Sequence, residues 1–536
     1  MAKPVSDPQK TIFDTDWLCP GVLDPETDHL IFVIRDEIAP LISDEDFADM
    51  YQQRGRRPIS PKVLVLTMLL QFLENLPDRQ AARNVRLRLD WKIAMGLSLD
   101  YEGFHFSVLE KFRDRLIENR KQRELFDRLI DKLVELGLIR PRGKQRIDST
   151  WVAGHLRKLT KLELMTESIR AAMMQIKKEL GKEVLEEAVP EEIISNYERV
   201  INSWKMDNNE LKERYIQAGK DAMLVLERLR AHKKREEFFK LEKVRILEKV
   251  FEQNFEIKQN GKPEPEDKVE RKEKIVTPHE PEARYSERKG KSWIGYKLQV
   301  TETAEESEQG EEVVNFITDV EVTNAAEHDS QYTIRAIERQ KEKGLEPEEM
   351  LTDSAYVNSG TIAEARKMDT ELTGPVSTGG GKRTEVPIED FEIDYERKQA
   401  ICPKGVRSKS WSKNKKGAIM ITFPKNECQR CDMYGKCTKS KRGRVLYLVA
   451  GHEIVKERKR EMKKESYKRK MRLRRPVEGT ISELVRAHGM RQARYRGRER
   501  IRLQAIFSAL AVNVKRYAKK LKRAIFPRAE TAVCAV

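Results

Sequence analysis

The chain has 536 residues, of which 39% are hydrophobic and 36% are charged, which indicates a globular protein of several domains. No apolar run reaches the roughly 18–20 residues that a membrane span needs, which argues against a membrane partner. The first residues, MAKPVSDPQKTIFDTDW, lack the apolar centre of a signal peptide, and six scattered cysteines do not resemble a secreted disulfide framework. We therefore expect a cytoplasmic protein.

The positive charge is concentrated at one end of the chain. The formal net charge is +17, and residues 451–530 alone hold 26 Lys and Arg against 8 Glu and no Asp. Phosphate neutralisation and counterion release would drive such a segment onto a polyanion such as DNA. A solvated basic helical face is the alternative.

The N-terminal part predicts helices. Residues 1–44 give little signal, whereas residues 45–120 read as short, well-punctuated helices. Ser60 and Pro61 are a typical N-cap and first helical residue in front of VLVLTMLLQFLENL. Compact helical units of this size bind DNA or form dimers, and the sequence favours neither.

The next segment begins with a short strand. Residues 144–150, within a segment at 140–155, predict a strand that carries Asp148. Residues 156–275 then predict a helical insert with a charged linker. One helical face of the insert repeats at intervals of three and four residues and is expected to pack against neighbouring helices: Leu211, Tyr215, Ala218, Ala222 and Leu226.

In residues 276–378 the hydrophobic periodicity changes from that of helices to that of alternating strands and helices. The expected order is a strand at 292–300, a strand at 312–322, a helix at 330–344, a strand at 348–356 carrying Asp353, and a helix at 360–368. Residues 379–450 then predict an irregular, cysteine-containing insert, and residues 451–530 a basic helical part. This order predicts an α/β fold. The order is that of an RNase H-like core that is split by a helical insert and by a small cysteine-containing insert. A helical N-terminal domain precedes this core in the chain.

Three carboxylates fall on this core at Asp148, Asp353 and Glu478. Hard oxygen ligands suit Mg²⁺, and two such ions could activate an attacking oxygen and stabilise a leaving oxygen at a phosphodiester. Each residue has an ordinary explanation when taken alone, as a turn former, a helix cap or a first-turn glutamate. Their order along the core is what favours a catalytic set.

Several blocks of the chain resemble bacterial DDE insertion-sequence transposases. The helical N-terminal block is GRRPISPKVLVLTMLLQFLENL and its continuation, and the first-Asp block is RIDSTWVAGHLRKLTKLELMTESIRAA. The central block is HEPEARYSERKGKSWIGYKLQVTET, and the second-Asp block is EEMLTDSAYVNSG. The last block, RRPVEGTISELVRAHGMRQARYRGRER and its continuation, holds Glu478. Together they cover most of the chain outside residues 1–40 and 181–270.

The resemblance implies that Asp148, Asp353 and Glu478 bind two Mg²⁺ or Mn²⁺ ions. It also implies binding of terminal inverted repeats, a homodimeric synapse of transposon ends, strand cleavage, and transfer to target double-stranded DNA in the bacterial nucleoid. Arg474 stands at the family's arginine position. Met471 and Val485 stand where related enzymes often carry tyrosine and lysine, which concerns phosphate contacts and leaves the carboxylates unchanged.

Basic residues around and after Glu478 are the expected DNA contacts. Arg474 and Arg475 lie within one helical turn of Glu478, and arginine suits bidentate phosphate binding. The run RQARYRGRER at 491–500 combines arginines with an aromatic residue that could stack on a base. A solvated basic loop is the alternative for that run. The further candidates are Arg486, Arg491, Arg494, Tyr495 and Arg496.

Four cysteines lie in the second insert, at Cys402, Cys428, Cys431 and Cys437. One CxxC pair with two further cysteines fits a structural Zn²⁺ site in a small insert with little apolar content. The five residues between Cys431 and Cys437 are more than a zinc-binding cysteine pair usually has, so free thiols are equally favoured.

Three other functions fit parts of the sequence. A catalytically silent, transposase-derived DNA-binding protein would keep the basic tail, but it would not need the three acidic residues. Another RNase H-like nuclease would not need the helical N-terminal domain or the long inserts. A basic helical scaffold would show no metal dependence.

Overall fold

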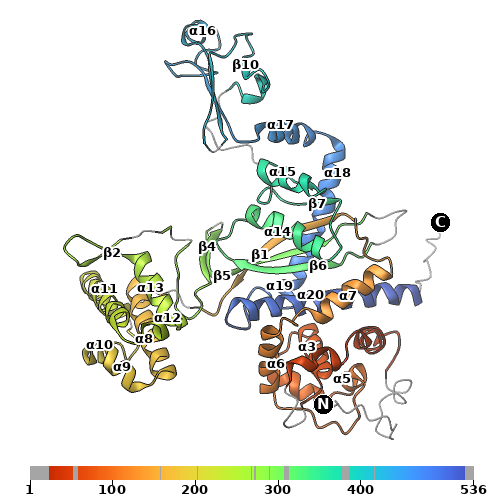
Figure 1. Ribbon diagram of the computed structural model, residues 1–536. Coiled ribbons are helices and arrows are strands. Elements are labelled where there is room, and N and C mark those ends of the chain that lie inside the picture. The colour runs from red at the N-terminus through yellow and green to blue at the C-terminus, as the bar shows by residue number, and fades with distance from the viewer. Residues whose placement is uncertain are drawn as a thin grey trace, which may run out of the picture.

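The computed structural model describes residues 23–525 apart from 52–57, 157–158, 202, 267–268, 271–272, 289, 307–312, 377–384 and 416. At the centre of this described part lies a six-stranded mixed sheet with helices on both faces (Figure 1). Its strands are β1 (Gln145–Ala153), β4 (Arg284–Arg288), β5 (Lys291–Thr303), β6 (Ile317–Asn324), β7 (Glu349–Leu351) and β8 (Glu371–Thr373). A mixed sheet covered by helices is an α/β fold, and that fold class is confirmed.

The pairing places β1 at the middle of the sheet. β1 runs antiparallel to β5 along its whole length and parallel to β7 at its start. β8 continues in parallel beyond β7, while β4 and β6 both pair antiparallel with β5. The path across the sheet is therefore β6-β5-β1-β7-β8, with β4 beside β6 on the outer edge of β5. Helices α14 (Asp329–Glu342) and α15 (Ser359–Lys367) follow β6 and β7 in the chain.

The strands of the sheet depart from the sequence expectation at several points. The strand expected at 348–356 ends at Leu351, so Asp353 follows it in a loop. Strand β8 was not expected, because a strand of three residues leaves too short an alternation to recognise. Residue 312, the expected start of another strand, lies outside the described residues.

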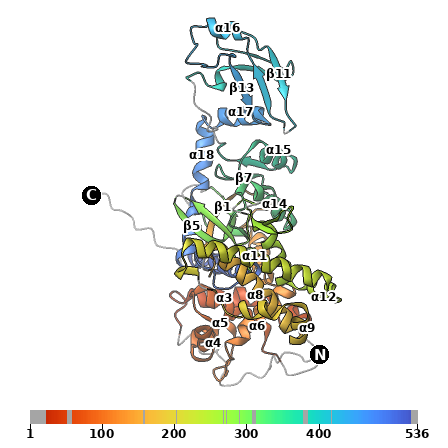
Figure 2. The same cartoon turned by 90° about the vertical axis from the view of Figure 1, so that its left-hand side faces the viewer.

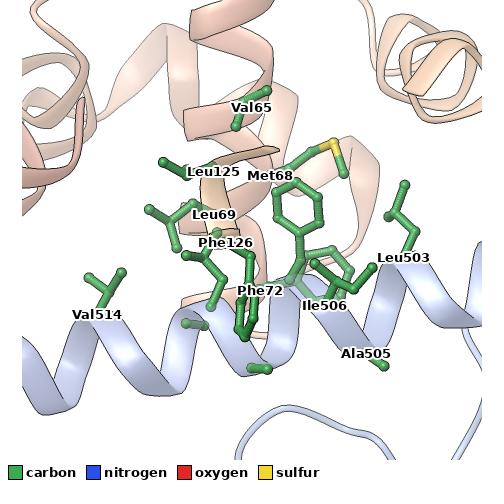
Figure 3. Packing of buried hydrophobic residues seen from close by; sticks show 14 of the residues in the cluster. Val65, Met68, Leu69, Phe72, Leu125, Phe126, Leu503, Ala505, Ile506 and Val514 are labelled. Carbon is green, nitrogen blue, oxygen red and sulfur yellow. The ribbon is translucent and has the colours of Figure 1, made fainter. Parts of the chain in front are cut away.

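The N-terminal helices and the last helix of the chain share one hydrophobic core with the sheet. The hydroxyl of Ser60 accepts the backbone N–H of Val63, and Pro61 opens α3, as the sequence predicts. Phe72 of α3 packs against Phe507 of the C-terminal helix, with ring centroids 5.8 Å apart. Figure 3 shows Phe72 and other buried side chains of the N-terminal helices facing Leu503 and Ile506 of the C-terminal helix. The N-terminal helices are α2 (His29–Val33), α3 (Pro61–Leu73), α4 (Asp78–Leu87), α5 (Leu89–Met95), α6 (Ser107–Glu118) and α7 (Glu124–Glu135), and the C-terminal helix is α20 (Arg498–Ile525).

This shared core limits how freely the N-terminal helices can move. A continuous cluster of buried residues joins α3, α7, α20 and the inner faces of β5 and β6. Helix α20 therefore lies between the N-terminal helices and the sheet (Figure 1). The helical N-terminal segment is thus built into the body of the protein through the opposite end of the chain.

The helical insert forms a second hydrophobic core of its own beside the sheet (Figure 1). The expected packing face is confirmed, because Tyr215, Ala218, Ala222 and Leu226 are buried and Leu211 packs against them. The charged part of the insert also supplies a short hairpin of β2 and β3. The insert contains α8 (Lys161–Glu179), α9 (Lys182–Ala188), α10 (Glu191–Asn196), α11 (Asn208–Ala231), α12 (Arg235–Lys240), α13 (Glu242–Asn254), β2 (Phe255–Ile257) and β3 (Pro263–Pro265).

The cysteine-containing insert lies at the far end of the molecule (Figure 2). The expectation of an irregular segment was wrong, because β11, β12 and β13 form an antiparallel sheet, and β9 and β10 form a hairpin. Strands of three or four residues gave no clear alternation in the sequence. The bounds are β9 (Glu392–Asp394), β10 (Gln399–Ile401), β11 (Ser410–Lys413), β12 (Ile419–Thr422), α16 (Lys425–Arg430) and β13 (Val445–Leu448).

Three helices return the chain from this insert to the sheet. They are α17 (His452–Glu461), α18 (Glu465–Arg474) and α19 (Pro476–Arg486). Helices α17 and α18 connect the cysteine-containing insert to the core (Figures 1 and 2). None of the helices in the described ranges is long and apolar enough to cross a membrane.

Candidate active site

Asp148 lies in the middle of β1 and faces the junction of α18 and α19. Its Oδ2 accepts a hydrogen bond from Nη2 of Arg474 at 2.6 Å, and its Oδ1 accepts the backbone N–H of Ser149 at 2.7 Å. The side chain is only 14% exposed. Burial raises the pKa of Asp148 to about 6, although Arg474 lowers it. The negative charge of this carboxylate therefore needs a cation beside it.

Asp353 and Glu478 reach the same region from two other elements. Asp353 follows β7, the parallel neighbour of β1, and its Oδ1 accepts the backbone N–H of Ala355 at 2.8 Å. Glu478 lies in the first turn of α19 with its side chain 67% exposed. The negative charges of Asp353 and Glu478 also raise the pKa of Asp148, although less than burial does. Asp353 and Glu478 thus lie within electrostatic range of Asp148.

Arg474 joins two of these carboxylates. Its Nη1 lies 3.2 Å from Oε1 of Glu478, while its Nη2 binds Asp148. The Arg474 side chain is 15% exposed, and its buried Nε has no hydrogen-bond partner among the described residues. A guanidinium group therefore supplies the positive charge between a buried and an exposed carboxylate.

A buried network that the sequence analysis missed fixes the α18–α19 junction onto the sheet. Glu302 of β5 is fully buried and pairs with Nε of Arg146, its cross-strand neighbour on β1, at 2.6 Å. The other oxygen of Glu302 accepts the hydroxyl of Thr480 at 2.6 Å and lies 3.1 Å from Arg516. Arg146 also donates to the carbonyl of Leu473 at 2.7 Å. In the chain, the bond to Leu473 lies just before Arg474 and the bond to Thr480 lies just after Glu478.

The donor set fits Mg²⁺ or Mn²⁺ by its chemistry, because it consists of carboxylate oxygens around a position that already attracts a cation. Within the described ranges, however, no three His, Cys, Asp or Glu side chains are arranged to hold a metal ion as they stand. At the candidate site, Arg474 binds Oδ2 of Asp148 and approaches Glu478.

The basic residues predicted to contact DNA fall into two groups. Arg475, Arg486 and Arg496 are exposed. Arg491 instead stacks on the ring of Trp151, with its guanidinium carbon 4.0 Å from the ring centroid, and donates to the carbonyl of that residue.

Arg494 and Tyr495 connect the C-terminal part to the N-terminal helices. Arg494 donates to the carbonyl of Leu76 at 2.9 Å and stacks over Phe72. Tyr495 packs against the guanidinium of Arg113, 4.5 Å from the ring centroid. These side chains thus bind other parts of the protein. His488 is also buried, with its ring against the carbonyl of Phe72.

The four cysteines of the insert converge. Cys402, Cys428, Cys431 and Cys437 all line one cavity of about 40 Å³, and all four are free thiols. The sulfur of Cys428 accepts the backbone N–H of Arg444, and that of Cys431 accepts the backbone N–H of Met433, each at 3.4 Å. Their sulfurs do not yet form a metal-holding group.

Two family models match separate parts of the chain. Residues 23–115 match the Transposase domain (DUF772), and residues 401–518 match the Transposase DDE domain. Searches of curated proteins and of solved structures find no significant match. The first family match covers most of the N-terminal helices, and the second contains Arg474 and Glu478. Both matches are to transposase families, and together they support a DDE transposase of an insertion-sequence family.

Proposed function

We propose that this transposase cleaves and rejoins DNA at a site formed by Asp148, Asp353 and Glu478. The observation that carries the proposal is the placement of these residues on a sheet with the path β6-β5-β1-β7-β8. One carboxylate lies on the central strand, one follows the strand parallel to it, and one lies on a helix that packs on β1. This is the arrangement expected of an RNase H-like core that two inserts interrupt.

The three carboxylates would hold two Mg²⁺ or Mn²⁺ ions, which activate an attacking water or 3′-hydroxyl and stabilise the departing oxygen. Asp148, on the central strand, would be one of their ligands. The network of Glu302, Arg146 and Thr480 would keep the helix of Glu478 against β1. No side-chain nucleophile is needed for this chemistry.

The DNA partners would be the terminal inverted repeats of the element and a target duplex. Exposed Arg475, Arg486 and Arg496 remain the proposed phosphate contacts, together with Arg474 once it leaves Asp148. Holding two ends at once requires a homodimer. A complex of end DNA with a single protein chain, measured by light scattering, would contradict the dimer.

Strand cleavage by the purified protein tests the function. The substrate is a duplex carrying the DNA that borders the gene in its source. We expect nicks at one position in Mg²⁺ or Mn²⁺ and none in EDTA. Cleavage that continues in EDTA would rule out the metal-dependent mechanism.

Replacing Arg474 by glutamine is expected to change metal binding and cleavage in opposite directions. Without DNA, the variant should bind Mn²⁺ at least about tenfold more tightly, because a cation that competes for Asp148 is gone. Cleavage should fall, because the phosphate loses its guanidinium partner. Electron paramagnetic resonance of free Mn²⁺ measures the Mn²⁺ affinity. Arg475→Gln is the matched control for this affinity measurement. Unchanged Mn²⁺ affinity would contradict the placement of the metal beside Arg474.

We also propose that the four converging cysteines hold a structural Zn²⁺ ion once their sulfurs turn toward the cavity centre. Backbone N–H groups already donate to two of the sulfurs, as thiolate ligands require. We expect about one zinc per chain, and zinc loss with unfolding of β11–β13 in Cys428→Ser. Atomic absorption measures the content, and a zinc-free protein of unchanged stability would overturn this proposal.

A further inference from the structure

The helix that leads into Glu478 is strongly basic. Between Lys463 and Arg475, eight residues are Lys or Arg and a single residue, Glu465, is acidic. This segment forms α18 and lies between the cysteine-containing insert and the sheet (Figure 1). The positive charges of this segment pair either with acidic groups of the protein or with groups of a binding partner.

One face of α18 is satisfied by the protein. Tyr467 is buried, and Lys470 binds Oε1 of Glu349 on β7 at 2.7 Å. Arg474 binds Asp148 at 2.6 Å. These residues recur at intervals of three and four, so they define the inward face of the helix.

The opposite face is not satisfied in this way. Arg469, Arg472 and Arg475 are all exposed, and none of them forms a salt bridge with another described residue. They follow one another at intervals of three, and the next step of three reaches Glu478. We call Arg469, Arg472 and Arg475 the arginine ridge.

A merely solvated helix face has a different charge pattern. On α11 of the helical insert, the exposed side chains mix both signs, and Arg214 pairs with Glu210 one turn away at 2.9 Å. Such pairs are typical of surface helices that contact only water. The arginine ridge keeps like charges adjacent, an arrangement that is mildly repulsive by itself and becomes favourable when a polyanion lies against it.

We propose that the arginine ridge binds the sugar-phosphate backbone of the DNA duplex whose strand is cut beside Glu478. Three arginines at a rise of 1.5 Å per residue span about 9 Å, which corresponds to about three base-pair steps. The duplex thus leaves the three carboxylates along α18 and runs toward the cysteine-containing insert, where exposed Lys463 and Lys464 prolong the basic surface. The ridge positions the DNA and touches no reacting atom. The inference rests on the proposed function for the place of cleavage.

Salt dependence of DNA binding tests the ridge separately from catalysis. A 30-base-pair duplex with a fluorescent label is titrated with full-length protein in EDTA, where no cleavage occurs, at several salt concentrations. The test variant replaces all three ridge arginines by glutamine. The matched control replaces Lys212, Lys220 and Arg228, three exposed cations of α11, by glutamine.

The slope of log K against log salt is negative, and we expect its magnitude to decrease by about 2–3 in the ridge variant, at about 0.9 per lost phosphate contact. The control should keep the slope of the original protein. Replacing the ridge arginines by lysines should restore most of the slope, which separates lost charge from misfolding. A ridge variant with an unchanged slope would overturn the inference, even if metal-dependent cleavage is intact. A reduced slope in a protein that never cleaves would support the ridge and count against the proposed function alone.

Discussion

Replacing Glu302 by alanine is expected to destabilise the sheet by about 3–5 kcal/mol. The change leaves the guanidinium of Arg146, whose side chain is 3% exposed, buried without its partner. It also removes the acceptor of Thr480 and a partner of Arg516. Hydrogen exchange of the backbone amides in β1 and β5 measures this loss locally.

Glu305 is the matched control for this experiment. Its side chain is 22% exposed and lies 3.9 Å from Arg140, a geometry in which an ion pair contributes less than about 1 kcal/mol. Glu305→Ala should therefore leave the exchange of β1 nearly unchanged. If the two variants exchanged alike, the Glu302 network would not be what holds β1 and α19 together.

Replacing Asp148 by asparagine is expected to lower DNA cleavage at least about a hundredfold. Changes in residues that merely orient a metal ligand cost about 10–100-fold, and Asp148 is proposed as a ligand itself. The amide keeps the size of the side chain, so the fold should remain. Binding of end DNA should persist, because the phosphate contacts are untouched.

Asp369→Asn controls for the loss of one negative charge. Asp369 follows α15, is 89% exposed and pairs with Arg142 at the surface. Its cleavage rate should match that of the unmodified protein. An Asp148→Asn variant that cleaves at the control rate would remove Asp148 from the proposed site.

The sequence predicts the three carboxylates as a set, from their order along the core and from the family resemblance, because none of them has a distinctive local signal. Asp148 lies on a strand, Asp353 in the loop after β7, and Glu478 in the first turn of a helix. The contact of Arg474 with Asp148 was not foreseen, because the two residues are 326 positions apart in the chain. The pairing of Arg146 with Glu302 depends on the register between β1 and β5, which no local pattern reveals. Glu302 lies beyond the strand expected at 292–300, so nothing in the sequence marked it as a buried strand residue.

Basic and aromatic residues were harder to interpret. The run that contains Arg494 and Tyr495 has the composition of a DNA-binding loop, yet both side chains pack against the N-terminal helices. Composition does not distinguish an arginine that binds a backbone carbonyl from one that binds a phosphate. The exposed ridge of α18 became recognisable when the inward partners of Lys470 and Arg474 were known.

Excision in cells, with the original protein and Asp353→Asn compared side by side, tests the central claim most directly. The gene is placed beside a marker flanked by the DNA that borders it in its source, and precise loss of the marker is counted. We expect excision with the original protein and none with Asp353→Asn, while both purified proteins bind the flanking DNA. Equal excision by the two proteins would show that Asp353 takes no part in the chemistry and would contradict the proposed three-carboxylate site.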